Sequence, residues 1–306
     1  MGCYKKTVLV LVPVLILSFL LMWFCTTSKT EKEDDFHLVA TFYPVYVATL
    51  NITEDVPGVS LENLVSSQTG CLHDYQLSPE NLITLSTADA WIVNGAGAES
   101  FLTEVAERYP TIPVIDSSEK ARLLPSGEDD EDEFYNSHMW TSPSVYATQV
   151  QTICDGLCSL DEAHASQYRK NTSTYLKKIM EVTKKLKNAS ENLPTNNVIL
   201  FHESLSYLAN DLGLHVLSVL PIGEEGGVAA SDLKEAANAI KDAEDVLLLY
   251  DDQYYDLKYE YLANSANRHK SLFLDIAVSK HQTTLDKDAW LLAMEDTASK
   301  LSEVSF

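Results

Sequence analysis

Four widely separated segments of this chain each carry one residue that coordinates divalent metal ions well. Each stands beside hydrophobic strand or turn sequence, and the four residues are His73, His138, His202 and Asp275. Imidazole nitrogen and carboxylate oxygen suit tetrahedral zinc, and a site filled entirely by protein ligands leaves no place for catalytic water. If the fold brings the four residues together, they predict a closed zinc site that carries or stores metal. Their spacing matches no local zinc motif, and any chain with 8 histidines contains some such widely spaced set.

The elements that must position these residues alternate between short β-rich runs and helical patterns. This alternation is typical of α/β lobes with mostly parallel sheets. Each half of the chain holds four expected strands: His37 to Tyr43, Val59 to Val65, Ala90 to Val93 and Pro113 to Ile115, then Val198 to Phe201, His215 to Leu220, Val246 to Tyr250 and Leu272 to Leu274. The predicted fold is therefore α/β, with two similar lobes and mostly parallel four-stranded sheets, although no strong residue-level repeat proves a duplication.

One helical pattern is longer than a usual globular helix. It runs from Asp161 to about Asn192 without Gly or Pro and ends before Pro194. We expect this helix to join the two lobes. The predicted domain boundaries are 1–25 for an export signal or membrane anchor, 26–35 for a tether, 36–160 for the N-terminal lobe, 161–193 for the linking helix and 194–306 for the C-terminal lobe.

The N-terminus predicts transfer of the chain across a membrane. Two lysines precede an apolar run from Val8 to Phe24, which fits the charged and apolar regions of an export signal. As a helix this run would span roughly 26 Å, just short of the ~30 Å hydrocarbon layer, so an uncleaved anchor is one reading. Cys25 closes the run and offers the other reading, a bacterial lipoprotein acylated on this thiol, although the three residues before it are bulky for such a cleavage site. Both readings place the rest of the chain outside the cell membrane.

The composition narrows the range of partners. The formal net charge is −23, which excludes nucleic acid as a partner. Six consecutive acids, Glu128 to Glu133, are typical of a solvated loop, and the alternative is that they gather cations near His138.

Cys71 is expected to be a buried small residue, with zinc ligation as the alternative. Cys154 and Cys158 lie four apart on an expected helix, where a disulfide is neither required nor excluded.

Several short motifs together resemble the metal-binding solute receptors of zinc and manganese ABC importers, the cluster A-I or zinc-uptake lipoprotein family. They are Thr41-Phe42-Tyr43-Pro44, His73-Asp74-Tyr75 with Ser78-Pro79, Ala88-Asp89-Ala90 leading to Asn94-Gly95, His138-x-Trp140-x-Ser142-Pro143, and His202 with Tyr207-Leu208. The resemblance covers nearly the whole exported chain. It implies two α/β lobes bridged by one long helix, with metal held in the cleft between the lobes.

The resemblance also implies roles for single residues. His73 and His138 resemble the first-lobe ligands, His202 resembles a second-lobe ligand, and Asp275 resembles the carboxylate that completes many of these sites. Manganese receptors usually place Glu where this chain has His202, so the resemblance points to zinc. Tyr43 and Trp140 either orient the imidazoles through packing or hydrogen bonds or are ordinary core aromatics. The first motif departs from the family pattern, because Leu72 and Gln76-Leu77 replace the usual prolines and acid around His73.

The function implied is an extracytoplasmic receptor that binds one zinc ion per chain as a monomer and delivers it to an ABC permease and its ATPase. The alternatives are a manganese receptor of the same family and a metal-dependent surface adhesin. A zinc hydrolase is disfavoured, because no second His follows His202-Glu203 at helical spacing.

Overall fold

The computed structural model describes residues 35–65, 72, 75–126, 135–220, 228–241, 243–252, 260–266, 268–276, 278 and 287–306. Residues His37–Phe306 form one compact unit. The apolar N-terminal run, Cys25, Cys71, His73 and the acidic run Glu128 to Glu133 lie outside the described residues, so the expectations for them stay predictions. No helix within the described ranges is long and apolar enough to cross a membrane.

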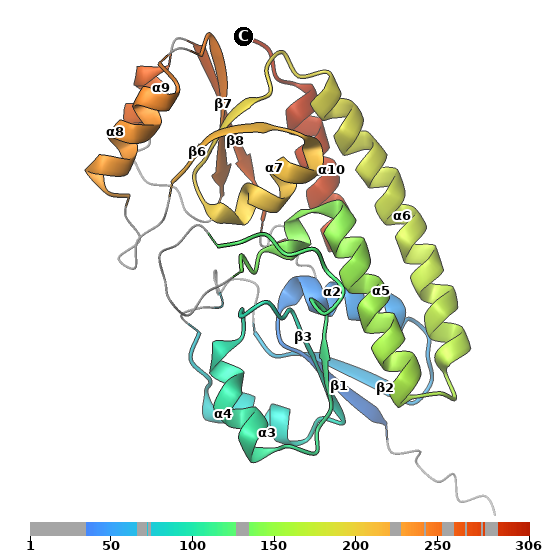
Figure 1. The fold of residues 1–306 in the computed structure, drawn as a ribbon. Coiled ribbons are helices and arrows are strands. Elements are labelled where there is room, and N and C mark those ends of the chain that lie inside the picture. Colours follow the sequence, from blue (N-terminus) through green and yellow to red (C-terminus); the bar gives the residue numbers. More distant parts are fainter. Residues whose placement is uncertain are drawn as a thin grey trace, which may run out of the picture. The chain divides into compact units, whose positions relative to one another are not determined.

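The first lobe is built on a four-stranded sheet in the order β2-β1-β3-β4 (Figure 1). Its strands are β1 (Phe36–Ala40), β2 (Val59–Asn63), β3 (Ala90–Val93) and β4 (Val114–Asp116). β3 pairs in parallel with both β1 and β4, in registers that place Leu38 opposite Ala90 and Trp91 opposite Val114. All four residues of β3 are buried, as expected for a central parallel strand with both faces covered.

The second lobe repeats this arrangement with the order β6-β5-β7-β8. Its strands are β5 (Asn197–Leu200), β6 (His215–Val219), β7 (Asp245–Asp251) and β8 (Arg268–Leu274), and every adjacent pair is parallel. In both lobes the first strand lies between the second and the third, which confirms the prediction of two similar α/β lobes. Ligands of such sheets bind beyond the carboxyl ends of the strands, where the strand order reverses. In these lobes that point lies between β1 and β3 and between β5 and β7.

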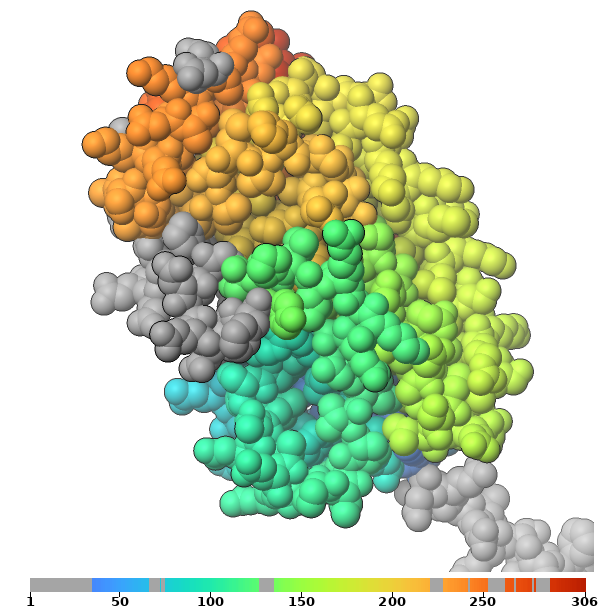
Figure 2. All heavy atoms as spheres, in the orientation of Figure 1, coloured from blue at the N-terminus to red at the C-terminus, as the bar shows by residue number. Residues whose placement is uncertain are grey.

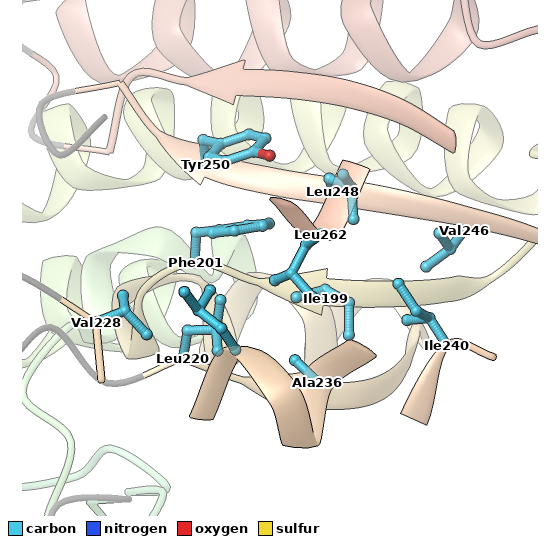
Figure 3. Close-up of a cluster of buried hydrophobic side chains, with 11 residues drawn as sticks. Ile199, Phe201, Leu220, Val228, Ala236, Ile240, Val246, Leu248, Tyr250 and Leu262 are labelled. Atoms are coloured by element: carbon cyan, nitrogen blue, oxygen red, sulfur yellow. The ribbon is translucent and has the colours of Figure 1, made fainter. Parts of the chain in front are cut away.

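A hydrophobic core fixes one face of the second sheet (Figure 3). Ile199 of β5 and Leu248 of β7 are fully buried and point toward Ala236 of α8 (Ala230–Ala239). Leu262 of α9 (Glu260–Ser265) completes this side of the core. Burial of each Ile or Leu side chain contributes about 1.5–3 kcal/mol to the stability of the fold. This core therefore holds β5 and β7 in place.

Two of the helices of the first lobe, α3 (Pro79–Ser86) and α5 (Pro143–Leu160), begin at serine caps. The others are α2 (Tyr43–Ile52), the 3₁₀ turn η2 (Ser100–Leu102) and α4 (Thr103–Arg108). The hydroxyl of Ser78 accepts a hydrogen bond from the Asn81 backbone, and that of Ser142 accepts one from the Val145 backbone. Each serine is followed by a proline at the first helical position.

One helix packs against both lobes, as predicted. This helix, α6 (Ala165–Glu191), contacts α2 and α5 of the first lobe and α7 (Ser206–Leu212) and α10 (Ala289–Ser302) of the second. Its buried residues recur at three- and four-residue intervals: Ala165, Tyr168, Thr172, Tyr175, Ile179, Val182, Leu186 and Ala189. This largely apolar stripe packs α6 against helices of both lobes.

Two strand boundaries differ from those expected from the sequence, and the state of one cysteine pair is defined. The first strand ends at Ala40, before the expected Tyr43, because α2 already begins at Tyr43 and Pro44 fits its first turn. β8 begins at Arg268, four residues early, because its whole length pairs with β7 and Arg268 forms an ion pair with Asp245. Cys154 and Cys158 are free buried thiols with their sulfur atoms 4.0 Å apart, so no disulfide joins them.

Candidate metal site

His138 lies in a buried turn between the first lobe and the start of α5. It caps the 3₁₀ turn η3 (Met139–Thr141), and the residue is 5% exposed. Asn94, which follows β3, donates from its side-chain nitrogen to the carbonyl of Ser137 at 2.8 Å. The carboxyl end of the central first-lobe strand therefore holds the backbone that carries His138.

His202 lies two residues after the end of β5, at the point where the strand order of the second sheet reverses. It caps the 3₁₀ turn η4 (Glu203–Leu205) and is 8% exposed. Its imidazole meets that of His138 edge to face, with ring centroids 5.1 Å apart and an interplanar angle of 87°. The structure therefore brings together two of the predicted ligands, one from each lobe.

The two turns that carry these histidines are joined by direct hydrogen bonds. The hydroxyl of Thr141 donates to the carbonyl of Ser204 at 2.9 Å. The hydroxyl of Tyr207 donates to the carbonyl of Asn136 at 2.8 Å and accepts from the backbone of Leu124 at 2.8 Å. In Figure 2 the green first-lobe surface meets the gold second-lobe surface along this contact. The two lobes thus share a polar, largely buried interface next to the histidine pair.

The Nδ1 atoms of the two imidazoles have different partners. Nδ1 of His138 lies 3.0 Å from Oδ1 of Asn136 and 3.7 Å from Oε1 of Glu203. Nδ1 of His202 accepts a hydrogen bond of 3.1 Å from the backbone nitrogen of Ser204. Glu203 lies on the Nδ1 side of His138, away from the Nε2 edge of the ring.

Asp275 comes directly after β8 and is 2% exposed. Its neighbour Ile276 accepts a hydrogen bond of 2.8 Å from the indole nitrogen of Trp140. The Trp140 ring lies 5.3 Å from the His138 ring and 4.6 Å from the Phe42 ring. Trp140 therefore connects the segment of His138 to the strand end of Asp275.

The other predicted residues are placed as follows. Tyr43 is buried at the start of α2 and stacks on Tyr46 with ring centroids 6.0 Å apart. His73 lies outside the described residues. Within the described ranges, no three His, Cys, Asp or Glu side chains are grouped so that they could hold a metal ion. The His138–His202 pair is thus what the structure assembles, and the four-ligand set stays a prediction.

A carboxylate that the sequence reasoning did not single out lies at the reversal point of the first sheet. Glu99 accepts hydrogen bonds from the Thr41 hydroxyl at 2.7 Å and from the backbone nitrogens of Asn94 at 2.7 Å and Gly95 at 3.0 Å. Burial raises the pKa of this carboxyl group from 4.5 to about 7, against the opposing effect of these donors. Glu99 thus fixes the turn from which Asn94 reaches Ser137.

Gly95 is required in this turn for two reasons. Its φ of +81° lies in the left-handed region, which side chains other than glycine rarely adopt. A Cβ atom at this position would also lie 1.9 Å from Oδ1 of Asp116. The Asn94-Gly95 motif is therefore a structural support for the histidine segment.

Comparison with known proteins identifies the family. The sequence profile of the zinc-uptake complex component A family, described as periplasmic, matches residues 38–304. This range contains both lobes and the histidine pair. The chain belongs to this family. It is therefore a metal-binding solute receptor of the zinc ABC importer type.

Two curated relatives are zinc proteins by name. The high-affinity zinc uptake system protein ZnuA of Bacillus subtilis is 24% identical over 246 residues, which cover 75% of this chain and 76% of the relative. The zinc-binding lipoprotein AdcA of Streptococcus pneumoniae is 23% identical over 241 residues, which cover 74% of this chain. The match spans about half of AdcA, 48% of its length.

Solved structures show the same fold. A zinc-bound ZnuA deletion mutant superimposes with a TM-score of 0.71 at 23% identity and covers 89% of this chain and 100% of its own. The receptor FpvC of Pseudomonas aeruginosa in complex with Mn²⁺ gives a TM-score of 0.73 at 22% identity, over 88% of this chain and 97% of its own. Zinc and manganese are both bound by proteins of this architecture.

Proposed function

We propose that this protein captures one zinc ion outside the cytoplasm and delivers it to an ABC-type membrane importer. The observation that carries the proposal is the meeting of His138 and His202, contributed by different lobes, at the reversal point of the second sheet. Family membership and the zinc-binding relatives support it. In this proposal zinc is cargo, held reversibly and handed on.

The proposed ligands are His73, His138, His202 and Asp275. Neutral imidazole is a good zinc donor, and a site dominated by imidazole favours zinc over manganese, which prefers carboxylate oxygen. Asp275 is attached to the strand end that Trp140 holds against the His138 segment. His73 precedes α3 in the sequence and is the third proposed imidazole.

The proposed protein is a receptor rather than an enzyme. A zinc hydrolase needs an open coordination position and a general base close to the bound water. Four protein ligands fill the coordination sphere, and Glu203 is 3.7 Å from Nδ1 of His138, on the side away from Nε2. This arrangement supports binding and release of the ion.

Delivery would require only a small movement of the lobes. The helix α6 packs against helices of both lobes, and buried hydrogen bonds such as Thr141 to Ser204 cross between them. Such a frame resists wide opening. Loading and unloading would therefore act through the turns that carry His138 and His202, and the loaded face would be presented to the permease by a monomer.

The proposed location is the outer face of the cell membrane. The family is described as periplasmic, and AdcA is a lipoprotein by name. A lipid on Cys25 or an uncleaved helix from Val8 to Phe24 would anchor this chain. The acidic surface, with a net charge of −23, would favour cations near the site.

Zinc competition titrations of single-ligand variants test the proposal. Alanine at His138 or His202 is expected to weaken zinc binding by more than about 100-fold. Loss of a group that only hydrogen-bonds to a metal ligand already lowers metal affinity by about 10- to 100-fold. His269→Ala is the matched control, since His269 is exposed on the edge strand β8. Unchanged zinc affinity in either variant would show that the substituted histidine is not a ligand. A wild-type protein that binds manganese more tightly than zinc would show that zinc is not the ion it carries.

A further inference from the structure

Asn136 lies two residues before His138 and uses every polar group it has. The residue is 1% exposed. Its backbone nitrogen donates to the Leu124 carbonyl at 2.9 Å, and its carbonyl accepts from the Tyr207 hydroxyl at 2.8 Å. Its side-chain nitrogen donates to the Glu203 carbonyl at 2.9 Å, and its Oδ1 accepts from the His138 backbone at 2.9 Å. A buried amide with this full set of partners is held in one orientation.

The orientation of this amide follows from its backbone partners alone. A backbone N–H can only donate, so the atom that faces the His138 nitrogen must be the oxygen Oδ1. A backbone carbonyl can only accept, so the atom that faces Glu203 must be the nitrogen Nδ2. The two contacts agree, and the oxygen is therefore the atom that also lies 3.0 Å from Nδ1 of His138.

This geometry sets the tautomer of His138. An amide oxygen accepts hydrogen bonds and cannot donate them, so Nδ1 of His138 must carry the proton. In a neutral imidazole the lone pair then belongs to Nε2. A metal ion can therefore be bound at Nε2 without moving a proton within the ring, and the ring is held at the angle that Asn136 fixes.

The same side chain joins the two lobes at the histidine pair. Its Nδ2 is bonded to the carbonyl of Glu203, the residue directly after His202. The Asn136 amide thus bonds His138 through its oxygen and the turn that carries His202 through its nitrogen. A change in its position would move both imidazoles relative to each other.

We propose that Asn136 is a positioning residue for zinc binding, which presents Nε2 of His138 to the metal and holds His138 in register with His202. The part that concerns zinc rests on the proposed function. The part that concerns the His138 tautomer does not, because it is a property of the zinc-free protein.

The test begins with ring ¹⁵N and ¹³C NMR of the zinc-free full chain. Wild-type His138 is expected to show the Nδ1–H tautomer, and Asn136→Ala is expected to lose this preference and to bind zinc about 10- to 100-fold more weakly. The matched control is Asn51→Ala, which also removes a buried amide, one that bonds the carbonyls of Val47 and Lys287. The control is expected to leave both the His138 tautomer and the zinc affinity unchanged.

A further variant keeps the proposal falsifiable if Asn136→Ala does not fold. Asn136→Asp retains the acceptor for His138 but loses the donor to Glu203, so it is expected to preserve the Nδ1–H tautomer. Its zinc affinity is expected to lie between those of the wild type and His138→Ala, because the bond to the Glu203 carbonyl is lost while the His138 ligand remains.

Three results would overturn the inference. They are the Nε2–H tautomer in the wild type, an unchanged tautomer in Asn136→Ala, and loss of the Nδ1–H tautomer in Asn136→Asp. If the tautomer follows these expectations but no variant of His138 or His202 affects zinc, the control of the His138 tautomer by Asn136 stands, whereas the proposed function and the zinc-binding part of the inference fail.

Discussion

The indole nitrogen of Trp140 donates a 2.8 Å hydrogen bond to the carbonyl of Ile276, across the boundary between the lobes. In turn, the carbonyl of Trp140 accepts a 2.9 Å bond from the indole nitrogen of Trp290 in α10. Because Trp140 is two residues from His138 and Ile276 follows Asp275, this bond ties two proposed zinc ligands to one buried aromatic group.

Trp140→Phe is expected to lower both stability and zinc affinity. The variant leaves the buried carbonyl of Ile276 without its donor, which costs about 1–3 kcal/mol in unfolding free energy. Urea unfolding measures this loss, and zinc titration is expected to show an affinity about 10-fold weaker. The matched control is Trp91→Phe, since buried Trp91 makes an equivalent bond to the carbonyl of Leu85 inside the first lobe. If both variants lowered zinc affinity equally, Trp140 would have no specific link to the site.

Glu99 is expected to make the stability of the protein depend on pH near neutrality. Its pKa is about 7 in the folded state and 4.5 when fully solvated, so the folded protein retains a proton that the unfolded chain releases between these values. The stability due to this group is therefore fully present below pH 4.5 and is lost as pH rises through 7. The loss amounts to about 1–3 kcal/mol, given that the residue is only partly buried.

Urea unfolding between pH 5 and 8.5 checks this expectation. Glu99→Gln cannot ionise, so its unfolding free energy should follow a flatter pH curve than the wild type. Glu119→Gln, a change on an exposed carboxylate nearby, serves as the control and should keep the wild-type slope. Identical slopes in Glu99→Gln and the wild type would show that Glu99 does not titrate in this range.

Zinc loading is expected to change the tautomer of His202. Nδ1 of this ring accepts a hydrogen bond from the Ser204 backbone N–H, so the neutral zinc-free ring carries its own proton on Nε2. Coordination through Nε2 moves that proton to Nδ1, where it opposes the Ser204 N–H, so the hydrogen bond must break. Ring ¹⁵N NMR with and without zinc measures the exchange. His215, whose Nδ1 lies 2.9 Å from the side-chain oxygen of Asn197, is the internal control and should not change. Identical His202 spectra with and without zinc would contradict the assignment.

Local signals were sufficient to predict most of the fold. Ser78-Pro79 and Ser142-Pro143 mark helix starts because the cap and the proline act within one turn. Runs of neighbouring residues in the sequence also predict the burial of β3 and the long apolar stripe of α6. The strand that was placed least well, β8, begins with three exposed residues, and only its pairing with β7 reveals them as a strand.

The candidate site was only partly predictable for the same reason. His138, His202 and Asp275 are recognisable as metal-binding residue types, whereas Asn136 and Glu99 look like ordinary polar loop residues in the sequence. Their roles arise from contacts with Glu203 and Thr41, far away along the chain. The nearby signals were the position of Asn136 two residues before a candidate ligand and the Asn94-Gly95 turn that leads to Glu99.

The most direct test of the account is zinc K-edge X-ray absorption on the purified full chain loaded with one equivalent of zinc. The account predicts one zinc ion per chain with four ligands, three imidazole nitrogens and one carboxylate oxygen, at about 2.0–2.2 Å. A spectrum with fewer than two imidazoles, or with a sulfur ligand at about 2.3 Å, would contradict it.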